Sequence, residues 1–334
     1  MSKMELVCPA GSLPALKAAV DNGADNVYMG FRDATNARNF PGLNFDEHTA
    51  ERGIRYAHER GCKVLLALNT YPQPQTWEIW TSAVDRAARL GVDVLILADA
   101  GLMRYATRTH PQLRLHLSVQ GSATSPEAIA FYRDNFNIQR VVLPRVLSLS
   151  QVRRVVENTD VEVETFAFGS LCVMVEGRCY LSSYATGESP NTCGACSPAK
   201  AVRWEETARG REVHLNQVLI DRYAPGENAG YPVICKGRFE VNGEVGYAIE
   251  APTSLSVLDI LPELQAIGVK AIKVEGRQRS PAYVAQVTRV LRQALDAASA
   301  SPESYIPRSD WIALLDKVSE GSTHTLGALE REWQ

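Results

Sequence analysis

The 334-residue sequence has no run of about 18 consecutive apolar residues, the length that a membrane-spanning helix requires. It also has no apolar core of about 7 to 15 residues after Met1, as a secretory signal peptide would have. We therefore expect no membrane span and a cytoplasmic protein. Acidic and basic residues nearly balance, 38 against 35, which gives a formal net charge of −3. This balance disfavours nucleic acid as a partner, because phosphate contacts supply most of the affinity for nucleic acid.

Motifs of the common hydrolases are missing as well. The sequence contains neither His-Glu-x-x-His, which places a zinc ion on a helix, nor Gly-x-Ser-x-Gly, which presents a nucleophilic serine. It has no fixed pairing of a cysteine with a histidine that would activate a thiol. A peptidase is therefore a less favoured alternative.

What the sequence does have, up to about residue 169, is an alternation of short β-rich runs with segments of helical periodicity. Strands that alternate with helices predict a parallel sheet. An eighth unit follows at 269–275, with a helix at 281–298 that begins at a proline. Eight units predict an α/β fold, a TIM-like (β/α)8 barrel. The first seven expected strands are 6–8, 26–30, 63–69, 93–99, 114–120, 140–145 and 161–168.

The long gap between the seventh and eighth strands predicts an insertion. We expect residues 1–169 to form the first seven units, 170–262 a cysteine-rich insertion, and 263–300 the unit that closes the barrel. Within the insertion, Asn242-Gly243 between two β-rich runs predicts a hairpin with a tight turn. The insertion leaves the carboxyl end of a strand, the face where such barrels place their chemistry. The tail, 301–334, is polar and is expected to be irregular.

Polar residues alternate with apolar ones along several expected strands. In the fifth, Leu115 and Leu117 would face the helices while His116 and Gln120 face the barrel interior, because residues two apart share a face. The same reasoning brings seven side chains toward one mouth of the barrel. They are Asn69, His116, Gln120, Arg145, Glu164, Lys273 and Glu275.

Two interpretations of this polar mouth remain open. Buried unpaired charges cost several kcal/mol, so the group either binds a ligand or satisfies itself. A self-satisfied group would pair Glu275 with Lys273, or Glu164 with Arg145, and would simply plug the barrel.

Five of the seven cysteines fall within 64 residues and have flanks rich in Gly, Ser and Pro: Cys172, Cys179, Cys193, Cys196 and Cys235. Such flanks let thiolates converge on a metal. Cys193-x2-Cys196 has the spacing of a zinc knuckle, but a second short pair is missing, so zinc and an iron-sulfur cluster both remain open. Disulfides are disfavoured in a reducing cytoplasm.

The run 164–182 carries a family signature. It reads Glu-Thr-Phe-Ala-Phe-Gly-Ser-Leu-Cys-Val-Met-Val-Glu-Gly-Arg-Cys-Tyr-Leu-Ser, which resembles the Glu-x-Phe, Gly-Ser-Leu-Cys and Gly-x-Cys-x-Leu-Ser pattern of the collagenase-like peptidase family. Further stretches, including 35–40 and 273–281, resemble the UbiU branch of that family, and together the matches cover nearly the whole chain.

This resemblance implies an oxygen-independent hydroxylase subunit of ubiquinone biosynthesis. Proteins of the UbiU branch form a heterodimer with a sister subunit, UbiV, act on a ubiquinone precursor, and work beside a lipid-carrier accessory protein, UbiT. The resemblance implies a [4Fe-4S] cluster on Cys172, Cys179, Cys196 and Cys235, with Cys193 as an additional thiol and an alternative to Cys196. Related enzymes hydroxylate tRNA or rRNA and draw the oxygen atom from prephenate, a dicarboxylate.

With this family in mind, we expect Glu164 and Glu275 to be catalytic, through proton transfer or orientation. The expected substrate-binding residues are Arg145, Arg178, Gln120, Asn69, His116 and Lys273, of which the two arginines would bind an anion such as prephenate. The alternatives are RNA hydroxylation with prephenate as oxygen donor, a collagenase-like peptidase, and a scaffold whose cluster only stabilises its partner.

Overall fold

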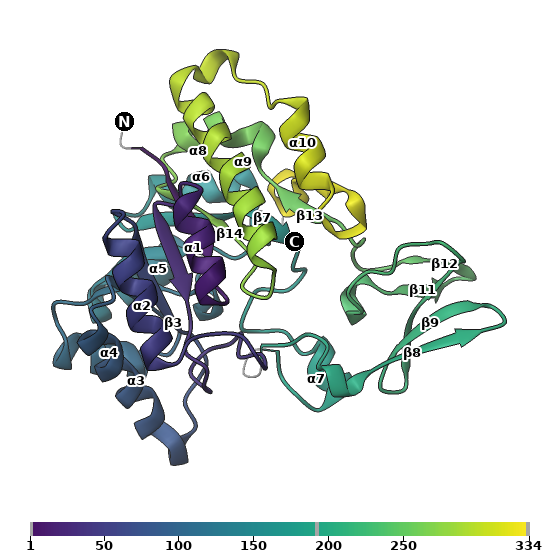
Figure 1. The fold of residues 1–334 in the computed structure, drawn as a ribbon, viewed down its shortest axis with the longest axis horizontal. Coiled ribbons are helices and arrows are strands. Elements are labelled where there is room, and N and C mark those ends of the chain that lie inside the picture. Colours follow the sequence, from purple (N-terminus) through teal and green to yellow (C-terminus); the bar gives the residue numbers. More distant parts are fainter. Residues whose placement is uncertain (1–2, 191–193, 332–334) are drawn as a thin grey trace.

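The computed structural model describes residues 3–190 and 194–331, and a closed barrel of eight parallel strands organises them (Figure 1). Each strand hydrogen-bonds to the next along the chain, and the last one pairs in parallel with both the first and the seventh. The predicted TIM-like barrel is therefore confirmed. Its strands are β1 (Glu5–Pro9), β2 (Asn26–Met29), β3 (Lys63–Leu68), β4 (Val94–Leu97), β5 (Arg114–Leu117), β6 (Ile138–Val142), β7 (Glu162–Ser170) and β14 (Ala271–Val274).

Helices connect the strands and cover the outside of the barrel. Several begin where a serine or aspartate side chain accepts a hydrogen bond from a free amide of the first turn, as Ser12, Asp99 and Ser280 do. The covering helices are α1 (Leu13–Asp21), α2 (Glu47–His58), α3 (Trp77–Leu90), α4 (Ala100–Thr109), α5 (Pro126–Phe136), α6 (Leu149–Glu157), α8 (Leu261–Ile267) and α9 (Pro281–Ala300). Of these, α8 was not predicted, because its seven residues are too few to show a helical period.

The barrel interior is apolar on one side and polar on the other. A large outer core lies between strands and helices and includes Leu115 and Leu117, while His116 between them is buried at 2% exposure. The polar side chains of β5, β6 and β7 therefore face inward, as the alternation predicts. The inner apolar cluster belongs to the other strands and comprises Val7, Tyr28, Leu65, Ala67, Val94, Ile96 and Ala271.

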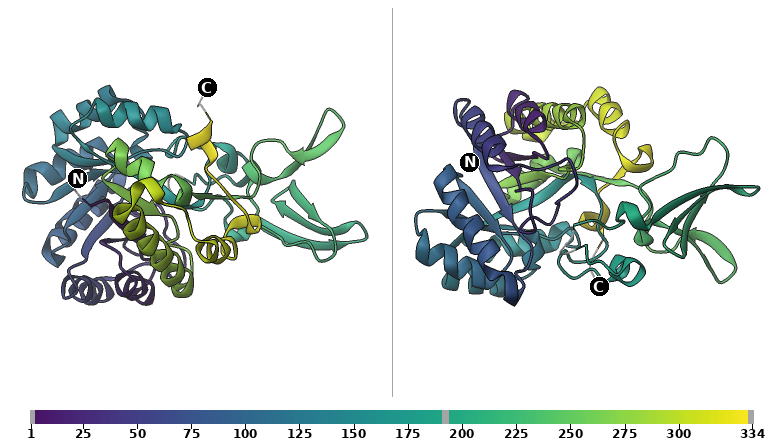
Figure 2. Two further views of the ribbon diagram at one scale, coloured as in Figure 1. Left: turned by 90° about the horizontal axis from the view of Figure 1, so that it is seen from above. Right: turned by 60° about the horizontal axis from the view of Figure 1, so that its bottom comes forward.

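Between β7 and β14 the chain leaves the barrel. Residues 181–190 and 194–247, here called the extension, begin with helix α7 (Leu181–Thr186) and reach to one side of the barrel in all three views (Figures 1 and 2). Three antiparallel strands, which were not predicted, come next: β8 (Val202–Thr207), β9 (Gly210–Leu215) and β10 (Val218–Tyr223). The predicted hairpin is present as β11 (Arg238–Val241) and β12 (Glu244–Tyr247). Asn242 and Gly243 both have positive φ, 54° and 85°, as a primed turn requires.

The tail is more ordered than the sequence indicated. Helix α10 (Ser309–Asp316) buries Trp311 and Leu315 in the outer core. Strand β15 (His324–Thr325) pairs with β13 (Ser254–Ser256), which itself pairs with the end of β7. The expectation of an irregular tail was wrong, because two well-spaced apolar residues are enough to dock a short helix. No helix among the described residues is long and apolar enough to cross a membrane.

Candidate metal centre and barrel mouth

The four cysteines named as cluster ligands come from four separate segments. Cys172 follows β7, Cys179 precedes α7, Cys196 lies in the loop before β8, and Cys235 lies in a short 3-10 helix, η4 (Ile234–Lys236). All four line one cavity at the carboxyl ends of the barrel strands. No disulfide joins any two of the six cysteines that the structure describes. Cys193, the alternative ligand, lies outside the described residues.

Two glycines hold the cysteine loops against the barrel. A β-carbon on Gly194 would lie 1.4 Å from the carbonyl oxygen of Ala37, and one on Gly177 would lie 2.3 Å from that of Gln120. Both glycines also have positive φ, which side chains rarely adopt. The Gly194 carbonyl accepts a hydrogen bond from Arg38 Nη1 at 3.0 Å. The loops that carry Cys179 and Cys196 are thus packed directly on barrel loops.

The thiols sit where ionisation is unfavourable without a cation. Burial raises the pKa of Cys172 to about 11 and that of Cys235 to about 12, and the neighbouring cysteines raise the pKa of Cys235 further. Burial also raises the pKa of Cys196. A bound metal reverses this preference, because thiolates are the ligating form and metal binding releases their protons. The donor set therefore fits a thiolate-bound metal centre.

The spacing of these sulfurs matters for the choice of metal. A single tetrahedral zinc ion, with Zn–S bonds of about 2.3 Å, needs sulfur atoms only about 3.8 Å apart. Among the described residues, no three of the four sulfurs lie within 4.8 Å of one another. These four thiols alone therefore do not meet the spacing of a single zinc site.

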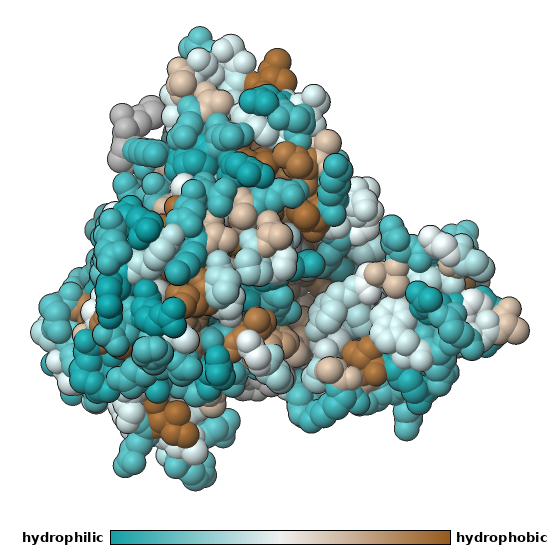
Figure 3. All heavy atoms as spheres, in the orientation of Figure 1, coloured by the Kyte–Doolittle hydropathy of each residue, from teal (hydrophilic) through white to brown (hydrophobic). Residues whose placement is uncertain are grey.

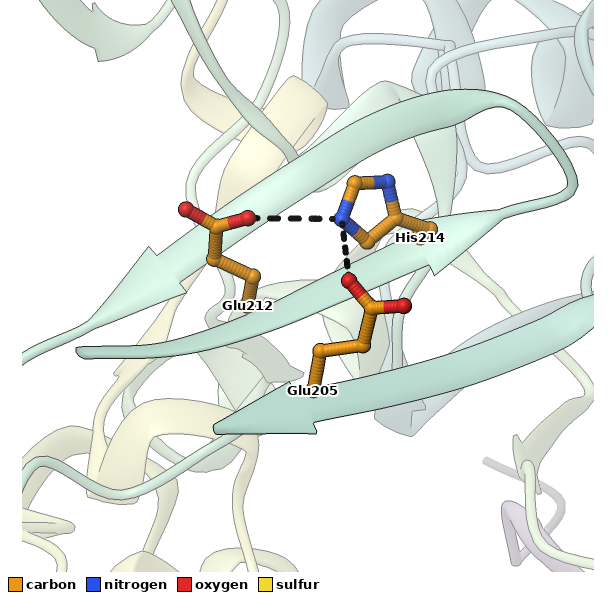
Figure 4. A group of neighbouring side chains, drawn as sticks. All are labelled: Glu205, Glu212 and His214. Atoms are coloured by element: carbon orange, nitrogen blue, oxygen red, sulfur yellow. Dashed lines mark ion pairs between the residues drawn. The ribbon is translucent and has the colours of Figure 1, made fainter. Parts of the chain in front are cut away.

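One group of metal-ligating side chains in the described chain does meet that limit, and it lies in the extension. His214 Nε2 is 3.5 Å from a carboxylate oxygen of Glu212 and 3.9 Å from one of Glu205 (Figure 4). Each carboxylate already has an arginine partner, Arg222 for Glu212 and Arg203 for Glu205, both at 2.8 Å. Ion pairing across β8, β9 and β10 accounts for this group, and we assign no metal to it.

A second, smaller cavity lies at the barrel mouth and adjoins the cysteine cavity. The two cavities share five lining residues, namely Arg38, Gln120, Arg145, Glu176 and Glu275. Of the predicted site residues, Asn69, Gln120, Arg145, Lys273 and Glu275 line the mouth cavity. Glu164 and His116 are buried but line neither cavity, and Arg178 is exposed and also lines neither.

Glu164 is fully buried and paired inside the barrel. Its carboxylate accepts from Lys273 Nζ at 2.6 Å and from Arg140 Nη1 at 3.3 Å. Arg140 also reaches Glu5 and Glu162, at 2.8 and 2.7 Å. The pairings offered from the sequence, Glu164 with Arg145 and Glu275 with Lys273, were wrong in their partners. The position of each side chain along the barrel axis decides which residues can pair. Strand β14 lies beside β7, so Lys273 reaches Glu164 from the neighbouring strand.

Arg145 is neutralised by a residue that the sequence analysis did not single out. Its Nε donates to Glu176 Oε1 at 2.7 Å, both side chains are buried, and its guanidinium lies 4.5 Å from the centre of the Phe166 ring. Glu176 lies in the loop between Cys172 and Cys179, within the family signature run. Arg145 therefore ties that loop to the barrel, which leaves less of its charge for a ligand.

Similarity to known proteins extends over nearly the whole chain. The model of Peptidase family U32 matches residues 11–331. The chain belongs to peptidase family U32. This U32 chain is 31% identical over 327 residues to "tRNA hydroxylation protein P1" of Bacillus subtilis, covering 97% of this chain and 70% of the relative. It is 29% identical over 303 residues to a 23S rRNA 5-hydroxycytidine synthase of Escherichia coli, covering 88% of this chain and 40% of the relative.

Other U32 relatives are named differently. A "Collagenase" of Porphyromonas gingivalis is 28% identical over 308 residues, covering 89% of this chain and 66% of the relative. A solved structure of a U32 peptidase aligns with 50% of this chain and 70% of its own, at 18% identity and a TM-score of 0.43. The curated relatives thus contain sequence that this chain does not match.

The U32 chain has two further arginines at the mouth that the sequence analysis did not name as site residues. Arg277 follows β14 and lines the mouth cavity, and Arg38 lines both cavities. Among the described residues, no carboxylate oxygen lies within 4.0 Å of either guanidinium. A sequence signal for Arg277 existed, since it comes two residues after Glu275 at the carboxyl end of a barrel strand.

Proposed function

We propose that this chain is the UbiU-like subunit of a heterodimeric iron-sulfur protein for oxygen-independent hydroxylation in ubiquinone biosynthesis. The observation that carries the proposal is the single cavity that four cysteines from four segments line, adjoining a polar barrel mouth. Its partner would be a UbiV-like sister subunit, and its substrate a ubiquinone precursor delivered by a lipid carrier such as UbiT. The hydroxylation proteins among the U32 relatives support the reaction class.

A [4Fe-4S] cluster fits the donor set better than zinc. Four half-buried thiols from separate loops, no three of which lie within 4.8 Å of one another among the described residues, suit a cofactor with several metal atoms. Held by Cys172, Cys179, Cys196 and Cys235, such a cluster would supply one-electron redox chemistry next to the barrel mouth.

Residues of the chain itself would bind the substrate and handle protons. Glu275 lines both cavities, and no cation of the described residues lies within 4.0 Å of its carboxylate. It is therefore the acid that we propose for proton transfer at the mouth. Glu164 is held in place by Lys273 and Arg140, and it would act indirectly, by fixing the position of the Lys273 amine.

Part of the wall of the cysteine cavity is apolar, as an aromatic substrate with a hydrocarbon tail would need. The apolar lining residues are Leu171, Val173, Met174, Leu181, Pro190 and Val233, and they lie beside charged residues such as Lys236, Glu275 and Arg279. In the view of Figure 3, apolar side chains form small separate areas on a largely hydrophilic outer face.

RNA hydroxylation with prephenate as oxygen donor is the second candidate. The names of several relatives favour it, because they describe tRNA or rRNA hydroxylation. The charge balance of this chain disfavours it. A collagenase-like peptidase has the weakest support, since raised thiol pKa values do not suit a cysteine nucleophile.

Growth without oxygen of a strain that lacks this chain separates the candidates. We expect mass spectrometry to show an accumulated, under-hydroxylated quinone precursor and unchanged RNA hydroxylation. Complementation with the wild-type chain restores the quinone, and complementation with Cys235→Ser does not. Normal quinones together with a missing RNA hydroxyl group would overturn the proposal in favour of the second candidate.

A further inference from the structure

Arg277 is a buried cation with no carboxylate oxygen within 4.0 Å among the described residues, although Glu275 lines the same cavity. Arg277 is 7% exposed, lines the mouth cavity, and lies with its guanidinium 5.4 Å from the centre of the Tyr28 ring. Burial is the main cause that lowers the pKa of Arg277 to about 10. A buried charge without a partner is costly and persists in proteins mostly where a ligand uses it.

The protein holds this guanidinium in a fixed position. Arg277 Nη1 donates to Asn36 Oδ1 at 2.7 Å. Asn36 is fully buried, and its Nδ2 donates to the Phe31 carbonyl and to Asn44 Oδ1, at 3.1 and 2.9 Å. A β-carbon on Gly11 would lie 1.7 Å from the carbonyl oxygen of Arg277, so the backbone there is closely packed as well. One donor is used for positioning, and the other donors of the fork stay available.

One further cation lies on the same cavity without a carboxylate partner. Arg38 donates to the backbone carbonyls of Ala37 and Gly194, and, like Arg277, has no carboxylate oxygen within 4.0 Å in the described chain. It lines the boundary between the two cavities.

We propose that Arg277, with Arg38 beside it, binds a carboxylate group of a small anionic substrate in the mouth cavity. This assignment rests on the proposed function, because it names the anion-binding residues of that same site. A guanidinium fork matches a carboxylate through two parallel hydrogen bonds, which also fixes the orientation of the ligand. Arg145 and Arg178, the arginines expected from the sequence, are respectively paired with Glu176 and exposed.

The competing explanation is that Arg277 only balances the negative charge of cysteine thiolates. The linings separate the two roles: Arg38 borders the cysteine cavity, whereas Arg277 lines the mouth cavity alone. We therefore assign Arg277 to the substrate side and Arg38 to the boundary.

Calorimetric titration of oxygen-free holoprotein with prephenate tests the assignment. We expect Arg277→Gln to bind prephenate at least tenfold more weakly than wild type, and Arg277→Lys to bind with intermediate affinity, since lysine keeps the charge and loses the fork. Arg104→Gln is the matched control, because it makes the same change at an exposed arginine of α4 that lines neither cavity, and we expect its affinity to be unchanged. Iron content and thermal midpoint are recorded for each variant.

Equal affinity in wild type and Arg277→Gln would overturn the assignment, as would a wild-type protein that does not bind prephenate. A shifted cluster reduction potential in Arg277→Gln with unchanged affinity would overturn it in favour of charge balance. If Arg277→Gln does not fold, Arg277→Lys and Arg38→Gln carry the same test. Binding is measured independently of hydroxylation, so normal quinones in the deletion strain would refute the proposed function while leaving this result intact.

Discussion

Lys273 Nζ donates to Glu164 Oε1 at 2.6 Å in the barrel interior, between the two strands that close the barrel. Glu164 is completely buried and Lys273 is 5% exposed, so neither charge is solvated by bulk water. Burial lowers the pKa of Lys273, and Glu164 acts in the opposite direction by favouring the charged amine. The pair lies in the polar half of the barrel interior, and Lys273 also lines the mouth cavity.

Removing one partner of this pair should lower the free energy of unfolding by more than the intact pair contributes to it, because an uncompensated charge is left buried. Lys273→Met leaves a buried carboxylate with Arg140 as its remaining partner, and we expect the free energy of unfolding to fall by about 3–5 kcal/mol. The double variant Glu164→Gln with Lys273→Met should recover much of that loss, because it removes the orphaned charge. Denaturant unfolding without oxygen measures both. A matched control is Arg55→Met, which breaks the exposed Arg55–Glu51 pair and should cost less than about 1 kcal/mol. Equal losses at the two sites would contradict this account.

His116 should make stability depend on pH. Burial first, and then the charges of Arg140 and Arg114, keep the pKa of His116 well below its ordinary value of 6.5. Below pH 6.5 the unfolded chain takes up a proton at this residue while the folded chain does not. Stability should therefore fall with falling pH, by up to about 1.4 kcal/mol per pH unit from this residue.

Unfolding free energies of wild type and His116→Gln between pH 7 and 5 check the sign. The wild type should lose more stability than the variant across that window. Parallel profiles would show that His116 takes up its proton in the folded chain as readily as in the unfolded chain, which would contradict the lowered pKa.

Gly194 should be needed to keep the cysteine loop on the barrel. Gly194→Ala places a methyl group against the Ala37 carbonyl, and we expect the loop to move and most of the bound iron to be lost. Gly187→Ala is the control: its φ of 73° is close to the 77° of Gly194, but no atom lies within 4 Å of the added carbon. It should cost about 1–2 kcal/mol from the backbone conformation alone and keep its iron. Full iron occupancy in Gly194→Ala would contradict the claim that iron binding needs the close packing of Gly194 on the Ala37 carbonyl.

Each proposed ligand should be required for iron. We expect serine at Cys172, Cys179, Cys196 or Cys235 to abolish the iron-sulfur absorbance of oxygen-free protein. Cys62→Ser, at a buried thiol outside the cavity, should retain it. Loss of iron in only one of the four variants would indicate a different centre.

Local patterns predicted the barrel well. The alternation of Leu115, His116 and Leu117 already separates the outer core from the interior, and Asn242-Gly243 specifies its turn without help from distant residues. Ion pairs that depend on the path of a loop could not be predicted from the sequence. Arg145 meets Glu176 only because the Cys172 loop folds back over the mouth, and no spacing in the sequence encodes that distance.

The three-stranded sheet was missed for a different reason. Strand β8 is mostly exposed and carries Arg203, Glu205 and Glu206, so it has no regular apolar alternation to reveal it. Long-range ion pairs such as Glu212 with Arg222 support that sheet, and a single sequence does not disclose them.

The central claim is that four thiols hold one iron-sulfur cofactor, and metal analysis with electron paramagnetic resonance of oxygen-free protein tests it most directly. The account predicts about four iron atoms and four sulfides per chain, little zinc, and, after reduction, a paramagnetic signal that Cys235→Ser lacks. One zinc ion per chain with no iron and no such signal would contradict it.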